Sequence, residues 1–148
     1  MVDSSRCDVK GSKCFTFLGF EFYWAKTRKG KLTVKRRTSK KKFCTSLAEL
    51  KEWVRKNRSR PLKELACTLR RKFNGYINYY GVIGNSARLW NYWNAGRKII
   101  YRGLNRRSQR KSYNWKSFDQ MWKTLGIPRP SIVEKPYNNQ HKWTLSYI

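Results

Sequence analysis

Acidic and histidine side chains, which carry most acid–base and metal-dependent chemistry, are few and scattered in this sequence. The 148 residues include 8 Asp and Glu, and Glu49 with Glu52 is the only close pair. Enzymes that cut or copy nucleic acids with two metal ions need clustered carboxylates, and a nuclease built on paired histidines cannot use the lone His141. No glycine-rich phosphate loop is present. We therefore predict that the chain by itself has no catalytic residues and binds no metal ion or other cofactor.

The four cysteines are also poorly placed for chemistry. They are Cys7, Cys14, Cys44 and Cys67, and no two have the short C-x-x-C spacing that zinc sites favour. The first residues lack the apolar core of a signal peptide, and no apolar run is long enough to span a bilayer. We therefore expect reduced thiols in a reducing compartment, either a bacterial-type cytoplasm or an organelle.

Positive charge dominates the composition. Lys and Arg number 35, which gives a formal net charge of +27, and Phe, Trp and Tyr make up 16% of the residues. Disordered basic chains are poor in aromatic residues, so this composition predicts a folded protein. Its partner should be a polyanion: a nucleic acid, an anionic membrane surface or an acidic protein. Aromatic residues interleaved with cations favour nucleic acid and not a membrane, because bases offer ring faces as well as phosphates.

The cations are concentrated in two parts of the chain. Residues 26–42 are dominated by Lys and Arg and contain no acid, and no Asp or Glu occurs from Leu65 to Phe118. Ordinary solvent-exposed helices mix the two signs of charge, so the second segment is expected to be a binding surface. Amides such as Asn74 and Asn78 could add hydrogen bonds there, because they both donate and accept.

Two strands are predicted near the N-terminus. An aromatic-rich run over 14–24 is followed by a turn signal at 26–30 and by a second alternating run over 31–35. This order predicts a β-hairpin, with the side chains of Leu18 and Phe20 packed in the interior.

Helical spacing follows the hairpin. Phe43, Leu47, Leu50 and Val54 recur at the spacing of one helix face. The further helices are expected to begin after Pro61, near Asn85 and after a cap supplied by Ser112 or Asn114.

These elements predict an α+β fold, in which an N-terminal β-hairpin precedes a bundle of three to four α-helices and an irregular tail. The predicted divisions are a disordered or frayed start at 1–14, the hairpin at 15–37, the helical domain at 38–127 and the tail at 128–148. Within the tail, residues 143–147 have a strand-like pattern.

Two motifs resemble a known family. Phe17-Leu18-Gly19-Phe20 resembles the FLGF segment that ends the palm in reverse transcriptases encoded by group II introns. The run Phe73–Tyr80 (FNGYINYY) is similar to the G-[WY]-x-N-Y-[FY] signature of the maturase domain, called domain X or the thumb, of the same family. The resemblance covers roughly residues 15–125 and implies a protein that binds intron RNA and stabilises its active fold, so that the ribozyme splices. The sequence contains no Tyr-Ala-Asp-Asp palm motif, so we expect a stand-alone or truncated maturase domain that cannot copy RNA.

The resemblance and the charge distribution together select the candidate contacts. In the motif, we expect Tyr76 and Tyr80 to be core residues, and Gly75 to permit close approach of a helix or of RNA. Of Trp90 and Trp93, one should face inward and the other outward. The predicted RNA-binding residues are Lys40, Lys41, Lys42, Arg70, Arg71, Lys72, Asn74, Gly75, Asn78, Tyr79, Arg88, Arg97, Lys98, Arg102, Arg106, Arg107, Arg110 and Lys111.

Two other functions are compatible with these residues. The chain could supply the thumb of a split reverse transcriptase whose palm is a separate protein, or it could be a generic basic RNA chaperone. On the first interpretation the main partner is group II intron RNA, with Mg²⁺ expected on the RNA and not on the protein. Target DNA within the ribonucleoprotein is a further expected partner.

Overall fold

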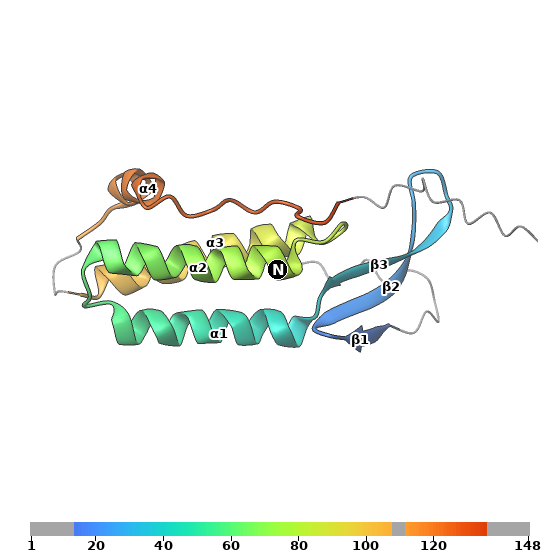
Figure 1. The fold of residues 1–148 in the computed structure, drawn as a ribbon, viewed down its shortest axis with the longest axis horizontal. Coiled ribbons are helices and arrows are strands. Elements are labelled where there is room, and N and C mark those ends of the chain that lie inside the picture. Colours follow the sequence, from blue (N-terminus) through green and yellow to red (C-terminus); the bar gives the residue numbers. More distant parts are fainter. Residues whose placement is uncertain (1–13, 108–111, 136–148) are drawn as a thin grey trace, which may run out of the picture.

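The computed structural model of the chain describes residues 14–107 and 112–135. A three-stranded antiparallel sheet stands at one end of the molecule. Three long helices lie between it and the opposite end, where a short fourth helix lies (Figure 1). The elements are β1 (Phe15–Phe17), β2 (Phe20–Lys26), β3 (Leu32–Thr38), α1 (Lys40–Asn57), α2 (Leu62–Tyr80), α3 (Ser86–Asn105) and α4 (Trp115–Thr124). This arrangement confirms the predicted α+β class and the order of hairpin before helices.

The sheet differs from the prediction in one respect, because the first aromatic run forms two strands. Leu18 and Gly19 both have positive φ, 48° and 82°, and this two-residue turn reverses the chain so that Phe15 pairs with Phe22. Positive φ at both central residues is typical of the tight turns that match the twist of a hairpin. The predicted packing of Leu18 is therefore wrong, since its side chain is 67% exposed at the turn. Phe20 does pack against the core, as predicted.

Polar side chains fix where the helices begin. The Ser39 hydroxyl accepts a hydrogen bond from the Lys42 N–H at the start of α1. Asn114, and not Ser112, caps α4: its side chain accepts from the Ser117 N–H, and the Ser117 hydroxyl accepts in return from the Asn114 N–H. Such caps satisfy N–H groups that have no partner within the helix.

Asn85 joins the sheet to the helices. Its side chain is 1% exposed, accepts a hydrogen bond from the Thr38 N–H at 2.9 Å and donates to the Thr38 hydroxyl and the Tyr80 carbonyl, both at 2.8 Å. A buried amide with all of these partners fixes one geometry. It therefore sets how β3 meets the end of α2.

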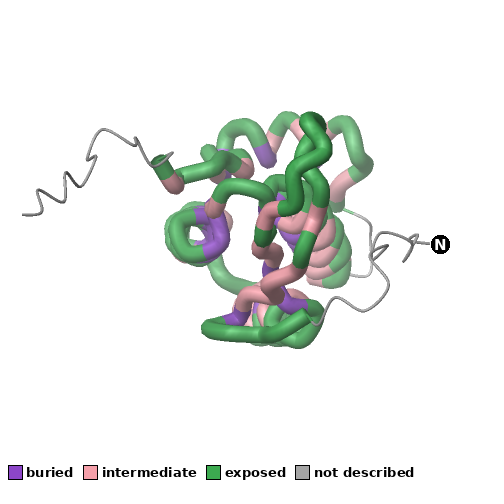
Figure 2. The backbone as a smooth tube through the Cα atoms, turned by 90° about the vertical axis from the view of Figure 1, so that its right-hand side faces the viewer, coloured by how far each residue is buried: buried purple, intermediate pink, exposed green. Residues whose placement is uncertain are grey.

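Aromatic rings fill the core between the helices. Phe73 and Phe118 are 1% and 0% exposed, and Trp122 of α4 meets both rings at about 6 Å between centroids. Tyr76 stacks on Tyr92 of α3 with centroids 3.5 Å apart. Viewed from the sheet end, buried positions lie among the helices, whereas the hairpin is largely exposed (Figure 2). The helices, and not the sheet, therefore form the core.

Two glycines of α3 let α1 pack closely against it. A Cβ at Gly96 would lie 2.8 Å from the Phe73 ring and 3.1 Å from Leu50, and a Cβ at Gly103 would lie 2.3 Å from Val54 Cγ1. α1 and α3 run in the same direction, with α2 antiparallel to both (Figure 1). As a result, the C-terminal ends of α1 and α3 meet at the end of the bundle remote from the sheet.

The segment after α4 returns along the bundle toward the sheet (Figure 1). The N–H groups of Val133 and Glu134 donate to the Gly81 carbonyl at 2.8 and 3.0 Å. The Glu134 carboxylate pairs with Arg36 and accepts from the Ile83 N–H, and these hydrogen bonds lower the pKa of that carboxyl. The described residues 128–135 form neither helix nor strand. The predicted frayed start and the strand-like run at 143–147 lie outside the described residues, except for Cys14.

Gly103→Ala should destabilise the fold by about 1–3 kcal/mol, because the new methyl overlaps a buried, β-branched side chain that has little freedom to move. Gly75→Ala is the matched control, since a Cβ at Gly75 meets no described atom within 4 Å other than its chain neighbours and the backbone of its own helix. That substitution should stabilise the helix by about 0.5–1 kcal/mol. Urea unfolding of both variants measures the difference, and equal stabilities would contradict this packing.

Candidate nucleic-acid interface

The predicted contacts on α2 gather on one face of that helix. Arg71, Asn74, Gly75 and Asn78 are all exposed, and their spacing of three, four and seven residues puts them on a common side. The buried residues of α2 occupy the opposite side. We call these four residues the α2 face. The predicted burial of Tyr76 and Tyr80 is confirmed, at 8% and 7% exposure.

Gly75 leaves part of the α2 face without a side chain, so that the helix backbone is exposed there. A glycine in the middle of a helix costs about 0.5–1 kcal/mol relative to alanine. Yet apart from its chain neighbours and the backbone of its own helix, no described atom lies within 4 Å of the position that its Cβ would occupy. Packing within the described protein therefore does not require a glycine here, and the predicted approach of a neighbouring helix is absent. What the glycine provides is exposed backbone that another molecule could approach closely.

Tyr79 stands beside the α2 face at the junction with the sheet. Its side chain is 52% exposed, its hydroxyl donates to the Leu18 carbonyl at 2.8 Å, and its ring stacks on Phe20. The hydroxyl is thus engaged within the protein. The tyrosine links α2 to the β1–β2 turn, and the exposed part of its ring is what a partner could contact.

One of the two tryptophans Trp90 and Trp93 faces outward and the other faces inward, as the sequence predicts. Trp90 is 43% exposed, whereas Trp93 packs against the core and donates its indole N–H to the Pro128 carbonyl at 3.0 Å. The outward tryptophan is half-buried against its inward neighbour.

Several of the predicted cations have partners within the protein. Arg97 pairs with Asp119 and lies over the rings of Trp93, Trp115 and Phe118. Arg70 donates to the Leu125 carbonyl at 2.6 Å, which joins α2 to the end of α4.

Two more predicted contacts also have internal roles. Arg107 donates to the carbonyls of Arg58 and Arg60, so it ties the end of α3 to the α1–α2 connection. Arg88 lies over the Phe43 ring at 5.5 Å. These arginines hold the fold together, and their contact with RNA stays a prediction.

The other described cations of the predicted set are exposed, but the structure does not bring them into one patch. Lys40, Lys41 and Lys42 lie where α1 leaves the sheet, whereas Arg102 and Arg106 lie at the opposite end of the bundle (Figure 1). A helix of 20 residues such as α3 is about 30 Å long. Besides Arg70, which is also exposed, the exposed cations of the set are Lys40, Lys41, Lys42, Arg71, Lys72, Lys98, Arg102 and Arg106. Lys72 also lies over the Trp53 ring, 5.4 Å from its centroid. Arg110 and Lys111 lie outside the described residues.

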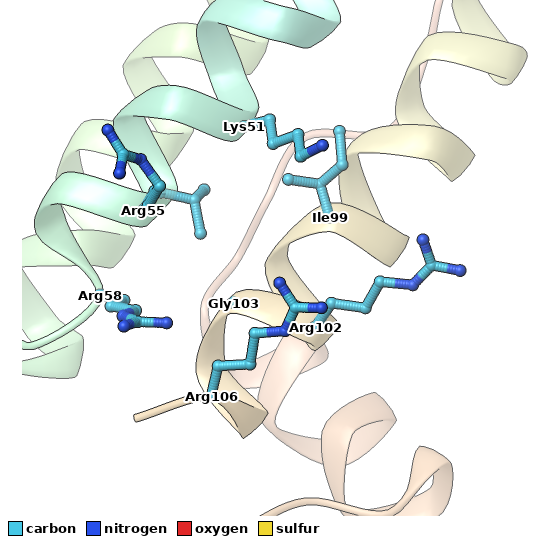
Figure 3. A pocket seen from close by; sticks show the side chains of 8 residues that line it. Lys51, Arg55, Arg58, Ile99, Arg102, Gly103 and Arg106 are labelled. Carbon is cyan, nitrogen blue, oxygen red and sulfur yellow. The ribbon is translucent and has the colours of Figure 1, made fainter. Parts of the chain in front are cut away.

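A basic groove between α1 and α3 was missed by the sequence reasoning. It has a volume of about 340 Å³ and is lined by Lys51, Val54, Arg55, Arg58, Ile99, Arg102, Gly103 and Arg106 (Figure 3). We call it the α1–α3 groove. The positions of Lys51, Arg55 and Arg58 at i, i+4 and i+7 are a signal of a shared helix face. What the sequence could not show is that α3 brings a second cationic row to the same place.

The described residues offer no metal site and no helix that could cross a membrane. No three Cys, His, Asp or Glu side chains gather at distances that could hold a metal ion. Of the described cysteines, Cys14, Cys44 and Cys67 are free thiols. None of the described helices is both long enough and apolar enough to cross a bilayer.

Fold and surface together define a basic helical module that carries a small sheet at one end. The family model described as "Group II intron, maturase-specific domain" matches residues 45–122. Because the match covers more than half of the 148 residues, the chain belongs to the group II intron maturase family. The family resemblance is thereby confirmed, and the matched range includes the run Phe73–Tyr80 but not Phe17–Phe20. Searches of the curated proteins and of the solved structures found no match.

Arg97→Ala and Lys98→Ala should have different effects on stability, although each removes one positive charge from adjacent positions of α3. Loss of Arg97 leaves Asp119 unpaired and removes the contacts with three rings, so the free energy of unfolding should fall by about 1–3 kcal/mol. Lys98 is exposed, and its loss should change stability by no more than about 0.5 kcal/mol. Thermal unfolding at fixed salt checks this, and equal losses would show that the Arg97 contacts are not structural.

Proposed function

We propose that the chain binds structured RNA, specifically group II intron RNA, and stabilises the folded form in which the ribozyme splices. Membership of the maturase family points to a role in group II intron splicing. The observation that carries the proposal is the α2 face, where the family motif presents a bare backbone position flanked by a cation and two amides, all exposed.

Positive charge on the protein is the physical basis of the proposed stabilisation of folded RNA. A compact RNA crowds phosphates together, and its folding therefore requires cations between them. No Asp or Glu occurs from Leu65 to Phe118, so α3 and the part of α2 that follows Glu64 have no acids of their own to neutralise their cations. Fixed side-chain cations at RNA junctions would reduce the Mg²⁺ that the RNA needs, while amides such as Asn74 and Asn78 would give hydrogen bonds between backbones.

Splicing of a group II intron transcript at low Mg²⁺, with and without the protein, tests this function. The protein should restore splicing at a Mg²⁺ concentration at which the transcript alone is inactive. An unrelated self-splicing RNA under the same conditions separates a maturase from a general RNA chaperone. Equal splicing with and without the protein would refute the proposal, and equal help to both RNAs would favour the chaperone.

Gly75→Ala should weaken binding to the intron transcript about three- to tenfold, because the methyl keeps the RNA away from the helix backbone; a tenfold change corresponds to about 1.4 kcal/mol. The same variant should unfold at a higher temperature than the parent, since alanine favours the helix. A loss of affinity therefore cannot be assigned to unfolding. Filter binding and thermal unfolding of one preparation give both values, and unchanged affinity would exclude Gly75 from the interface.

The sheet offers a specific observation in favour of the second candidate, the thumb of a split reverse transcriptase. Phe15, Phe17, Trp24 and Val34 are each about half exposed or more, and β1, β2 and β3 pair so that these side chains share one face. An exposed apolar face of this kind is typical of a protein contact. Primer extension by a palm-containing protein, with and without this chain, tests it. No stimulation would eliminate this candidate.

A further inference from the structure

We propose that the α1–α3 groove binds a single unstacked nucleotide, such as one from a bulge or loop of the RNA, with its base on the apolar floor and its phosphates on the cationic rim. This inference rests on the proposed RNA binding and adds a contact mode that the α2 face does not provide. It also concerns three cations, Lys51, Arg55 and Arg58, that lie outside the predicted RNA-binding set.

The floor of the groove is apolar because two helices meet closely there. Val54 is 5% exposed, Ile99 is half-buried, and Gly103 packs so closely on Val54 that a Cβ at this glycine would overlap the valine. The volume of about 340 Å³ falls at the lower end of the range for small-ligand sites, roughly 300–1,000 Å³. The hollow is therefore of a size that suits one small planar group.

The rim is strongly cationic. Lys51 and Arg55 come from α1, and Arg102 comes from α3 (Figure 3). Arg58 and Arg106 are the residues that directly follow these two helices. Arg55 is neutralised by Glu52, with its Nη2 atom 2.8 Å from the carboxylate, and this arginine lowers the pKa of Glu52. Among the described residues, no acidic side chain forms an ion pair with the other four cations. The rim therefore has a surplus of positive charge for an anionic ligand.

Helix ends account for part of this charge but not for the groove. The C-terminal turn of a helix favours cations, which explains residues such as Arg55 and Arg102 in the last turns of α1 and α3. Lys51 lies well before the last turn of α1, and the dipole gives no reason for an open apolar floor between the two rows. The helix dipole alone therefore does not explain the groove, whereas a ligand with both apolar and anionic parts would use both the floor and the rim.

An unstacked nucleotide has this combination, whereas simpler ligands do not. A lone phosphate would need the rim but not the floor, and the stacked bases of a duplex are not available to enter a hollow between helices. RNA-binding proteins commonly take up splayed bases from loops and bulges, stacking them on aromatic or guanidinium groups. Here the arginines of the rim can stack on a base or pair with its phosphates.

Binding of three RNA hairpins that differ at one position tests the groove. One has a single-nucleotide bulge carrying 2-aminopurine, the second has an abasic bulge and the third is fully paired. The parent protein should bind the first at least fivefold more tightly than the other two, with a change in 2-aminopurine fluorescence. Equal affinity for all three would overturn the inference, and equal affinity for the two bulged hairpins would show that the groove takes phosphate only.

Two groove variants test whether the preference for the bulged hairpin comes from the groove or from positive charge in general. The double variant Lys51→Ala with Arg106→Ala should lose the preference for the bulged base, whereas Lys29→Ala with Lys123→Ala, which removes the same charge from exposed positions outside the groove, should keep it. Ile99→Trp fills the floor without changing any charge, and it should also abolish the preference while thermal unfolding confirms that the protein is folded. A preference that persists in both groove variants would contradict the assignment.

An intron transcript measured alongside distinguishes the two proposals. If the parent protein binds the transcript but shows no preference among the hairpins, only the groove inference fails. If it binds neither the transcript nor any hairpin at low salt, the proposed RNA binding fails, and the groove inference fails with it.

Discussion

The constraint on which the rest of the structure depends is a net charge of +27 that must be carried by one compact fold. Like charges at close range oppose compaction, so the fold needs a strongly apolar interior and a way to spread its cations. The interior is supplied by the aromatic rings between α2, α3 and α4, such as Phe73, Tyr92 and Trp122. Of the acids in the described part of the chain, Glu21, Glu52, Asp119 and Glu134 are each paired with an arginine. The acids therefore stabilise the fold locally, and most of the positive charge stays available to a partner.

The described cations of the predicted RNA-binding set are of two kinds, those with partners inside the protein and those without. Arg70, Arg97 and Arg107 face partners inside the protein and join elements that are distant in the sequence. Residues such as Lys98 and Arg106 are exposed, and among the described residues they form no ion pair with an acid. Alanine substitution of the first kind is expected to lower the stability of the fold, whereas substitution of the second kind is expected to lower the affinity for RNA. The proposed function depends on the second kind.

Much of the fold could be predicted because its signals are local. The spacing of Leu50 and Val54, the cap at Asn114 and the inward turn of Tyr76 all follow from short-range periodicity and hydrogen bonding. The β1–β2 turn could not, because Leu18 is an unusual residue for positive φ and Gly19 alone is a weak turn signal within an aromatic run. The α1–α3 groove and the pairing of Arg97 with Asp119 also escaped prediction. Both arise where separate helices meet, and the spacing along one helix does not specify its neighbour.

The dependence of RNA affinity on salt tests the central claim most directly, which is that surplus cations on a rigid helical scaffold neutralise crowded phosphates. With a group II intron transcript at constant Mg²⁺, the logarithm of the association constant should fall linearly with the logarithm of the NaCl concentration. If about 6–10 phosphates are contacted, the affinity should fall by roughly 10³–10⁵-fold between 50 and 200 mM salt. An affinity that is nearly independent of salt over this range, or an absence of binding at 50 mM, would contradict the account.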